Sequence, residues 1–271
     1  MNFHVTEGVI LAAGLSTRLK SYLNGNSKLI TPILGRPLIT FPIMNFISVG
    51  IKRIIIVANK DNFWAIKKIT NEISSDVNIR IVVNRKPELG NGYSFLLGRK
   101  YVYSDFFVLS MGDHIYVPRV LRTLLNALSD DVDIVLGADS SPRFIEVAEA
   151  TKILVFKDRV IGIGKKLGLF SHVDIGVMLI KKKLFEFLDE YKIKSPIGLS
   201  EIINLAIRRG FKVGIADVNG DFWTEVDTPS DLRQVLIGER KIVVQNLIQK
   251  LKPLLLSSYM QKRSQIHELT E

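Results

Sequence analysis

A short N-terminal segment carries residues whose types and spacing could bind phosphate. Residues 8–19 read Gly-Val-Ile-Leu-Ala-Ala-Gly-Leu-Ser-Thr-Arg-Leu, and Lys28 follows. The apolar half predicts a buried strand, and the small residues after it predict a tight loop whose backbone N–H groups can approach phosphate oxygens. Gly14 has no Cβ to block a ligand. Arg18 offers a planar fork suited to phosphate, and Lys28 offers a point charge.

Two better-known phosphate-binding motifs do not fit this segment. A Walker loop would continue into Gly-Lys-Ser/Thr, and a dinucleotide fingerprint would need a second and a third glycine. Ser16 and Thr17 nevertheless add hydroxyl donors to the loop. The alternative interpretation of these residues is a plain strand-to-helix turn with a solvated Arg18.

Two aspartates beside predicted elements could serve phosphoryl-type transfer. Asp113 follows the apolar strand predicted over 106–110, and Asp227 comes just before Thr228-Pro229, which predicts a helix start. Such transfer needs a metal ion that bridges phosphate oxygens, and carboxylates that hold the metal. Taken alone, each aspartate is equally well explained as a turn or helix-start residue.

The N-terminal segment resembles the signature of the nucleotidyltransferases that make nucleotide-sugars and related compounds. Leu-Ala-Ala-Gly-x-x-x-Arg-Leu, with a lysine farther on, carries the resemblance. It implies that Arg18 holds the outer phosphates of a nucleoside triphosphate and that Lys28 reaches the α-phosphate. The family often has a glycine where Ser16 stands and a proline where Ser27 stands. The loop residues that would wrap the triphosphate are Leu11, Ala12, Ala13, Gly14, Ser16 and Thr17.

The same resemblance assigns roles to the acidic residues and to a second glycine-rich turn. It implies that Asp113 and Asp227 are Mg²⁺ ligands, with Glu225 as a further candidate that acts through water. Asn91 and Gly92, in Leu-Gly-Asn-Gly-Tyr-Ser, would lie over the nucleobase and let backbone groups read its edge. Without the resemblance, this turn reads as an ordinary helix entry.

Later motifs narrow the resemblance to the CTP:inositol-1-phosphate cytidylyltransferases of archaea. They are, in order, residues 90–94, 111–114, 142–144, 149–152, 173–176 and 199–202. The resemblance implies that Arg143, Lys152 and Asp174 face the inositol phosphate. Lys165, in Gly-Ile-Gly-Lys-Lys, resembles the lysine that the family places on the acceptor phosphate. Members of this family are often fused to a membrane phosphatidyltransferase-type domain, and residues 257–263 are similar to the junction.

Composition excludes several classes of site. The chain has no cysteine, so a disulfide framework, a thiolate metal site and a catalytic thiol are excluded. Its four histidines show no metal-ligand spacing. The formal charge of +10, from 37 basic and 27 acidic residues, suits an anionic partner. With 47% hydrophobic residues among 271, the chain can form one large or two small domains.

Strand-like and helix-like segments alternate through the first half of the chain. The predicted strands are 8–13, 53–58, 79–83, 106–110 and 133–136, and the predicted helices are 38–49, 62–73, 92–103 and 118–128. Continuous β-branched runs in this order predict a mainly parallel sheet sandwiched by helices. Ligands bind beyond the carboxyl ends of such strands, where the N-terminal loop and Asp113 both fall.

The second half of the chain shows a different pattern of predicted strands and helices. Strands over 150–156, 160–164 and 173–181 read as antiparallel, and residues 157–159 predict a hairpin turn between the first two. Helices are expected over 184–191 and 200–209, and a long helix is expected from Pro229, with a strand over 211–218 before it. The predicted fold class is therefore α/β, with a mixed, mostly parallel sheet and a small antiparallel lobe. The resemblance implies that this is a Rossmann-like nucleotidyltransferase fold with the lobe over the acceptor site.

Residues 1–238 are predicted to form the nucleotidyltransferase domain, and residues 239–271 a basic amphipathic helical tail. The first part of the tail is expected to pack across the body, and peripheral membrane association is an alternative for the rest. The N-terminus lacks the pattern of a signal peptide, and no apolar run approaches about 18 residues. A cytoplasmic protein is therefore expected.

The predicted activity is Mg²⁺-dependent transfer of the cytidylyl group of CTP to inositol-1-phosphate, giving CDP-inositol and pyrophosphate. One alternative is the same chemistry with UTP, GTP or ATP on a sugar-1-phosphate or another phospho-alcohol. Another is a non-catalytic nucleotide-sensing subunit. Nucleic acid is not a predicted partner, because no known binding motif accompanies the positive charge.

Overall fold

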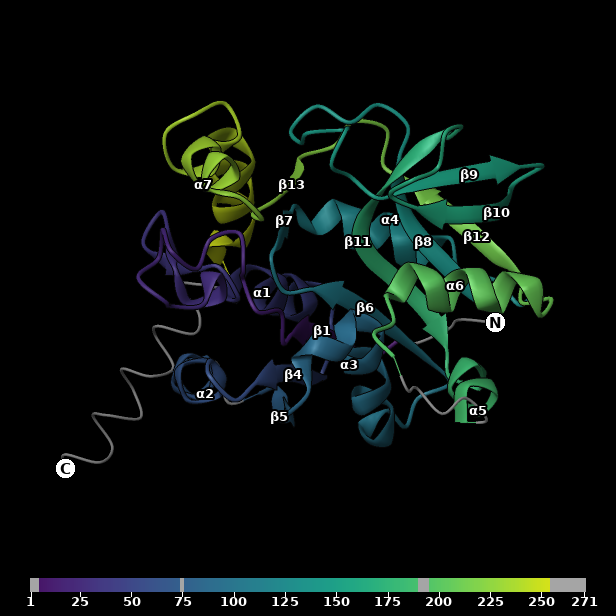
Figure 1. Cartoon of the computed structure of the whole chain (residues 1–271), viewed down its shortest axis with the longest axis horizontal. Coiled ribbons are helices and arrows are strands. Elements are labelled where there is room, and N and C mark those ends of the chain that lie inside the picture. The colour runs from purple at the N-terminus through teal and green to yellow at the C-terminus, as the bar shows by residue number, and fades with distance from the viewer. Residues whose placement is uncertain (1–4, 74–75, 190–194, 254–271) are drawn as a thin grey trace.

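Most strands of the described chain, which comprises residues 5–73, 76–189 and 195–253, form one nine-stranded sheet in this computed structural model (Figure 1). In spatial order the main path is β10 (Arg159–Gly164), β9 (Lys152–Phe156), β11 (His172–Lys181), β6 (Phe106–Met111), β1 (Glu7–Ala12), β4 (Arg53–Asn59) and β5 (Asn78–Asn84). From this path, β8 (Ile134–Asp139) pairs with β11, and β12 (Val213–Asp217) pairs with β8.

The sheet is mixed, as predicted. Strands β6, β1, β4 and β5 are mutually parallel, and β12 is parallel to β8. Strand β11 runs antiparallel to β6, β8 and β9, and β9 and β10 form the predicted hairpin. Lys157 and Asp158 at its turn have φ values of 46° and 60°, as the central residues of a type I′ turn require.

β1 lies between β4 and β6, and this placement positions the candidate site. Leu11 is opposite Val57 on one side and Met111 on the other. The loop after β1 and the turn after β6 therefore emerge side by side at the carboxyl edge of the sheet. This is the edge at which α/β sheets bind ligands.

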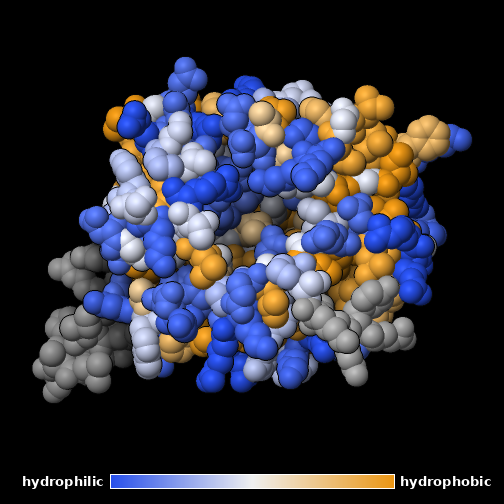
Figure 2. All heavy atoms as spheres, in the orientation of Figure 1, coloured by the Kyte–Doolittle hydropathy of each residue, from blue (hydrophilic) through white to orange (hydrophobic). Residues whose placement is uncertain are grey.

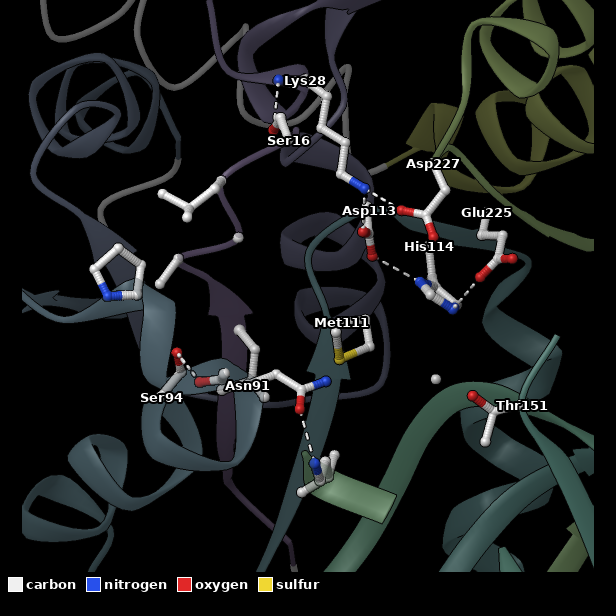
Figure 3. A pocket seen from close by; sticks show the side chains of 18 of the residues that line it. Ser16, Lys28, Asn91, Ser94, Met111, Asp113, His114, Thr151, Glu225 and Asp227 are labelled. Carbon is white, nitrogen blue, oxygen red and sulfur yellow. Dashed lines mark hydrogen bonds and ion pairs between the residues drawn. The ribbon is translucent and has the colours of Figure 1, made fainter. Parts of the chain in front are cut away.

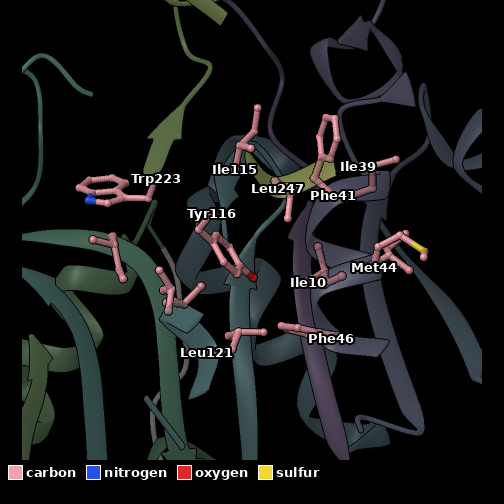
Figure 4. Close-up of a cluster of buried hydrophobic side chains, with 14 of the residues drawn as sticks. Ile10, Ile39, Phe41, Met44, Phe46, Ile115, Tyr116, Leu121, Trp223 and Leu247 are labelled. Atoms are coloured by element: carbon pink, nitrogen blue, oxygen red, sulfur yellow. The ribbon is translucent and has the colours of Figure 1, made fainter. Parts of the chain in front are cut away.

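Alternate residues of β1 pack into two separate hydrophobic clusters, one on each face of the sheet. Ile10 belongs to the first cluster, with side chains from α1 (Thr40–Ser48) and α4 (Pro118–Asn126) (Figure 4). Helix α7 (Pro229–Leu236) adds Leu232 and Val235 to this cluster. Val9 belongs to the second, with side chains from α3 (Gly90–Gly98), α5 (Lys183–Asp189) and α6 (Leu199–Arg208). Helix α2 (Phe63–Asn71) adds Ile66 to the first cluster.

Several short elements of the structure are absent from the sequence prediction. Strand β7 (His114–Tyr116) pairs antiparallel with β13 (Trp223–Glu225). The others are β2 (Pro32–Ile33), β3 (Arg36–Pro37) and the 3₁₀ helices η1 (Lys28–Ile30) and η2 (Pro87–Leu89). A third 3₁₀ helix, η3 (Arg99–Tyr101), falls within the helix predicted over 92–103. The β7–β13 pair matters most, because it joins the segment after Asp113 to the segment before Asp227.

The C-terminal part of the described chain differs from the prediction in one respect. The helix that begins at Pro229 ends at Leu236 and is therefore short, and residues 241–253 are helical again. In this second helix Val243, Val244, Leu247 and Leu251 are buried in the first cluster. The predicted boundary at residues 238/239 stays a prediction, and the predicted membrane-facing part of the tail and the junction-like residues 257–263 lie outside the described residues.

None of the helices within the described ranges is long and apolar enough to cross a membrane.

We expect Leu247→Ala to lower the free energy of unfolding by about 2–5 kcal/mol, because Leu247 is fully buried and its truncation leaves a cavity. Chemical denaturation measures this loss. Ile242→Ala, on the half-exposed face of the same helix, is the control and should cost under about 1 kcal/mol. Equal losses in the two variants would contradict the packing of this helix on the core.

Candidate active site

A pocket of about 650 Å³ opens at the carboxyl edge of β1 and β6. The molecular face above this edge is hollowed near its middle, and hydrophilic side chains lie around much of the opening (Figure 2). Three groups of side chains define it: a charged cluster, Asn91 and Ser94 at the entry of α3, and Thr151 before β9 (Figure 3). The pocket is therefore lined from both the parallel and the antiparallel parts of the sheet.

The loop after β1 contains a residue in the left-handed backbone conformation and an open approach to its backbone. Ser16 has φ of 54°, a left-handed conformation that glycine adopts more readily, which accounts for the glycine common at this position in similar signatures. The Ser16 hydroxyl accepts a hydrogen bond from the backbone N–H of Lys28 at 3.3 Å. Nothing lies within 4 Å of the position that a Cβ on Gly14 would take, so a ligand can approach the backbone there.

Most of the predicted loop residues line the pocket, and one does not. Those that line it are Leu11, Ala13, Gly14, Ser16 and Thr17. Ala12 instead faces the first hydrophobic cluster, and its carbonyl accepts a hydrogen bond from the Asn62 side chain at 2.8 Å.

Two buried asparagines hold this loop in place, and sequence reasoning missed both. Asn59 donates from Nδ2 to the carbonyls of Ala13 and Gly14, each at 3.2 Å. Asn62 holds Ala12 and also accepts from the backbone N–H of Asn59 at 3.0 Å. Asn59 is the last residue of β4 and Asn62 follows that strand, so their position at the carboxyl end of a strand predicted beside the N-terminal loop was a signal that could have identified them.

A lysine ammonium group held between two carboxylates forms the centre of the charged cluster. Lys28 Nζ lies 2.6 Å from Asp113 Oδ2 and also pairs with Asp227 Oδ1 (Figure 3). The Lys28 side chain is only 9% exposed. Burial by itself would lower the pKa of Lys28, but the charges of Asp113 and Asp227 outweigh it and raise that pKa to about 12.

Arg18 extends the cluster from the N-terminal loop. Its Nη2 lies 2.5 Å from Asp227 Oδ2, and its Nη1 lies 3.7 Å from a carboxylate oxygen of Glu149. Arg18 is nearly half exposed, so its guanidinium lies at the rim of the pocket and Lys28 lies at its floor.

His114 stands between two acidic side chains on the other side of Asp113. Its Nδ1 lies 2.8 Å from Asp113 Oδ1, and its Nε2 lies 3.3 Å from Glu225 Oε2. Burial opposes a charged imidazole, yet the hydrogen bond and charge of Asp113 raise the pKa of His114 to about 9. Burial also tends to raise the pKa of Asp113, but Lys28 and His114 together hold it well below its usual range.

The donor set fits a magnesium ion that the protein shares with its substrate. Asp113 and Asp227 converge on one cationic atom, Lys28 Nζ, so the two carboxylates already define a place for positive charge. Among the described residues, no group of three or more acidic or histidine side chains could hold a metal by itself. Mg²⁺ is commonly held by one or two carboxylates together with substrate phosphates and water, and this arrangement matches that requirement.

At the entry of α3, the backbone N–H of Gly92, which was expected to read the edge of the nucleobase, is bonded within the protein instead. The side-chain oxygen of Asn91 accepts a hydrogen bond from the Leu199 N–H at 2.7 Å, and Asn91 lines the pocket. The Gly92 N–H donates to the Ile197 carbonyl at 3.0 Å, and Gly92 does not line the pocket. A Cβ on Gly92 would lie 2.8 Å from that carbonyl oxygen, so packing against the segment before α6 requires this glycine.

The acceptor side of the pocket contains two of the predicted substrate residues. Lys165 and Asp174 both line it, from the ends of β10 and β11 respectively. Asp174 Oδ1 accepts a hydrogen bond from the Gly176 N–H at 3.0 Å. Desolvation of the Asp174 carboxyl raises its pKa to about 6, against a weaker opposite effect of that hydrogen bond.

The other two predicted substrate residues are placed differently from the expectation, since neither Arg143 nor Lys152 lines the pocket. Arg143 donates to the Gly220 carbonyl and lies over the ring of Phe144, so its guanidinium is engaged in packing. Lys152 Nζ donates to three backbone carbonyls, those of Ala148, Ala150 and Lys165. Lys152 therefore ties the β10 end to the turn before β9.

Comparison with known proteins identifies the family to which this chain belongs. Residues 8–208 match the MobA-like NTP transferase domain. The chain is 35% identical over 230 residues to the bifunctional IPC transferase and DIPP synthase of Archaeoglobus fulgidus, with 84% of this chain and 42% of that protein covered. It is 31% identical over 229 residues to the protein of the same name in Thermococcus kodakarensis, with 83% and 49% covered. The chain thus spans about half the length of these relatives.

A solved structure matches over nearly the whole chain. The inositol-1-phosphate CTP transferase from T. maritima superposes with a TM-score of 0.82 at 30% identity, and the match covers 93% of this chain and 98% of that one. This likeness confirms the predicted nucleotidyltransferase fold.

The raised pKa of Asp174 predicts a pH-dependent gain in stability for Asp174→Asn. The neutral carboxyl stabilises the folded state fully below its unfolded pKa of about 3.9, and this contribution is lost as the pH rises through about 6. The asparagine stays neutral, so we expect the variant to unfold at higher urea near pH 8, by up to about 3 kcal/mol at about 1.36 kcal/mol per pKa unit. Near pH 4 the two proteins should be similar.

Asp158→Asn, in the exposed hairpin turn, is the control and should show no such pH-dependent difference. If Asp174→Asn gained the same stability at pH 4 as at pH 8, the raised pKa would be wrong.

Proposed function

The chain belongs to the family of MobA-like NTP transferase domains, and from this membership we propose that it transfers the cytidylyl group of CTP to inositol-1-phosphate, giving CDP-inositol and pyrophosphate. The convergence of Lys28, Arg18, Asp113 and Asp227 in one pocket is the observation that carries the proposal. The likeness to the T. maritima inositol-1-phosphate CTP transferase supports the choice of substrates.

The proposed reaction is an in-line substitution at the α-phosphorus of CTP. An oxygen of the acceptor phosphate forms the new P–O bond, and the bond from the α-phosphorus to the bridging oxygen of pyrophosphate breaks. A phosphate monoester has a second pKa near 6, so the acceptor is largely dianionic at neutral pH and needs no general base. Catalysis then depends on positioning and on charge stabilisation.

The cationic residues of the pocket supply that stabilisation. Lys28, at the pocket floor, would stabilise the charge that grows at the α-phosphate, and Arg18, at the rim, would hold the departing pyrophosphate. Asp113 and Asp227 would hold Mg²⁺, which when bound neutralises charge on substrate phosphate oxygens. The loop after β1 presents backbone N–H and hydroxyl groups, and these would cradle the triphosphate.

Residues on the opposite wall would bind the acceptor. Lys165 is exposed at the pocket wall and would pair with the acceptor phosphate. Asp174 also lines the pocket, where its carboxylate would accept hydrogen bonds from polyol hydroxyl groups. Its raised pKa supports such a role, because a desolvated carboxylate retained at a pocket costs stability.

Pyrophosphate release tests the proposal directly. The full chain is incubated with Mg²⁺ and each of the four NTPs in turn, with inositol-1-phosphate, glucose-1-phosphate or phosphocholine as the acceptor. We expect release with CTP and inositol-1-phosphate. Release with another pair would keep the chemistry and overturn the substrates. No release from folded protein that still binds nucleotide would favour the non-catalytic subunit.

We expect Asp113→Asn to lower kcat by about 100-fold or more, because it removes one of the two carboxylates proposed to hold the metal. Lys28 keeps Asp227 as its partner, so the fold should survive, and circular dichroism checks this. Asp158→Asn is the matched control and should retain wild-type kcat. Near-wild-type turnover by Asp113→Asn would refute the metal assignment.

A further inference from the structure

His114 lines the pocket and is held by contacts on three sides. In the β7–β13 pair it lies directly opposite Glu225, whose carboxylate is 3.3 Å from Nε2. On the other side Nδ1 meets Asp113 Oδ1 at 2.8 Å. The residue is buried, and both ring nitrogens contact carboxylates (Figure 3).

On the third side, the imidazole ring packs against the backbone of β11 at Gly176. The β11–β8 register shifts between Asp174 and Met178, and within that irregularity Gly176 has φ of 70°. A Cβ on Gly176 would lie 2.5 Å from both Cδ2 and Nε2 of His114. Because no real Cβ tolerates such a distance, the ring occupies its place only while residue 176 is glycine.

These contacts divide the two oxygens of Asp113 between two neighbours. Oδ1 is bound to His114, and Oδ2 faces Lys28 and, beyond it, Asp227. Without the histidine, Lys28 would hold the carboxylate through Oδ2 alone, and rotation about its terminal torsion, which is broad, would be less restricted. Mg²⁺ demands nearly ideal octahedral geometry, so a rotating ligand would bind it poorly.

We propose that His114 is a positioning residue that fixes Asp113 for the divalent cation, with Gly176 and Glu225 holding the ring in place. The inference rests on the proposed function in one respect, namely that Asp113 and Asp227 hold the metal. His114 itself touches neither substrate nor metal in this role. It acts through the hydrogen bond between Nδ1 and Asp113, as residues behind metal ligands commonly do.

Mn²⁺ binding to the full chain tests this role. Free Mn²⁺ is followed by electron paramagnetic resonance, without nucleotide and with CTP, against protein-free blanks. We expect His114→Leu to raise the Kd for Mn²⁺ by about 10–100-fold. His114→Asn should recover most of that loss, because its amide nitrogen is as many bonds from Cβ as Nδ1. His172→Asn, at the start of β11 and outside the pocket lining, is the control and should bind Mn²⁺ normally.

Steady-state kinetics separate positioning from general damage. In His114→Leu the KM for Mg²⁺ should rise, while kcat at saturating Mg²⁺ should fall much less. Wild-type Mn²⁺ affinity in His114→Leu would overturn the proposal, and so would an equal loss in His114→Asn.

If His114→Leu does not fold, a double-mutant cycle of Gly176→Ala and His114→Asn tests the positioning role of His114. Alanine at residue 176 is strained in both backgrounds, because the backbone φ there is 70°. Gly176→Ala should therefore raise the Kd for Mn²⁺ more in the wild-type background, where its Cβ also displaces the ring, than beside the smaller asparagine of His114→Asn. Equal effects in both backgrounds would overturn the proposal. Failure of the proposed function looks different: no turnover with any NTP, while these Mn²⁺ affinities still change as described.

Discussion

The buried ammonium group of Lys28 is the interaction on which the rest of the site depends. A charge removed from water is costly unless it is paired, and Lys28 is paired with two carboxylates from distant parts of the chain. Asp113 comes from the turn after β6, and Asp227 precedes α7. The fold must therefore bring three segments to one point, and the proposed function puts a nucleoside triphosphate and its metal ion at that same point.

Much of the surrounding structure holds these segments in place. Asn59 and Asn62 fix the loop after β1 through backbone carbonyls, and η1 begins directly at Lys28. The buried carboxylate of Asp139 accepts hydrogen bonds from the Gly220 N–H at 2.7 Å and from Trp223 Nε1 at 2.6 Å. This fixes the start of β13, the strand that leads to Asp227.

Several residues around the pocket adopt a conformation or an environment that lowers the stability of the folded protein. Ser16 holds a left-handed backbone conformation that a glycine would adopt more easily, and its hydroxyl in return accepts the Lys28 N–H. The Asp174 carboxyl is desolvated enough to raise its pKa to about 6. Gly176 leaves a gap in β11 that the His114 ring fills. Such departures from the most stable choice gather at one pocket, as is typical of functional sites.

The sequence by itself determined the order of the strands and helices, the mixed sheet and the placement of the N-terminal loop and Asp113 at one edge, because these follow from local hydrophobic periodicity and turn chemistry. Only the tertiary structure decided how side chains divide their contacts. Arg143 and Lys152 are basic residues in suggestive motifs, yet nearby backbone carbonyls engage both. The β7–β13 pair and the contact of His114 with Glu225 join residues more than a hundred positions apart, and local sequence carries no signal for such pairing.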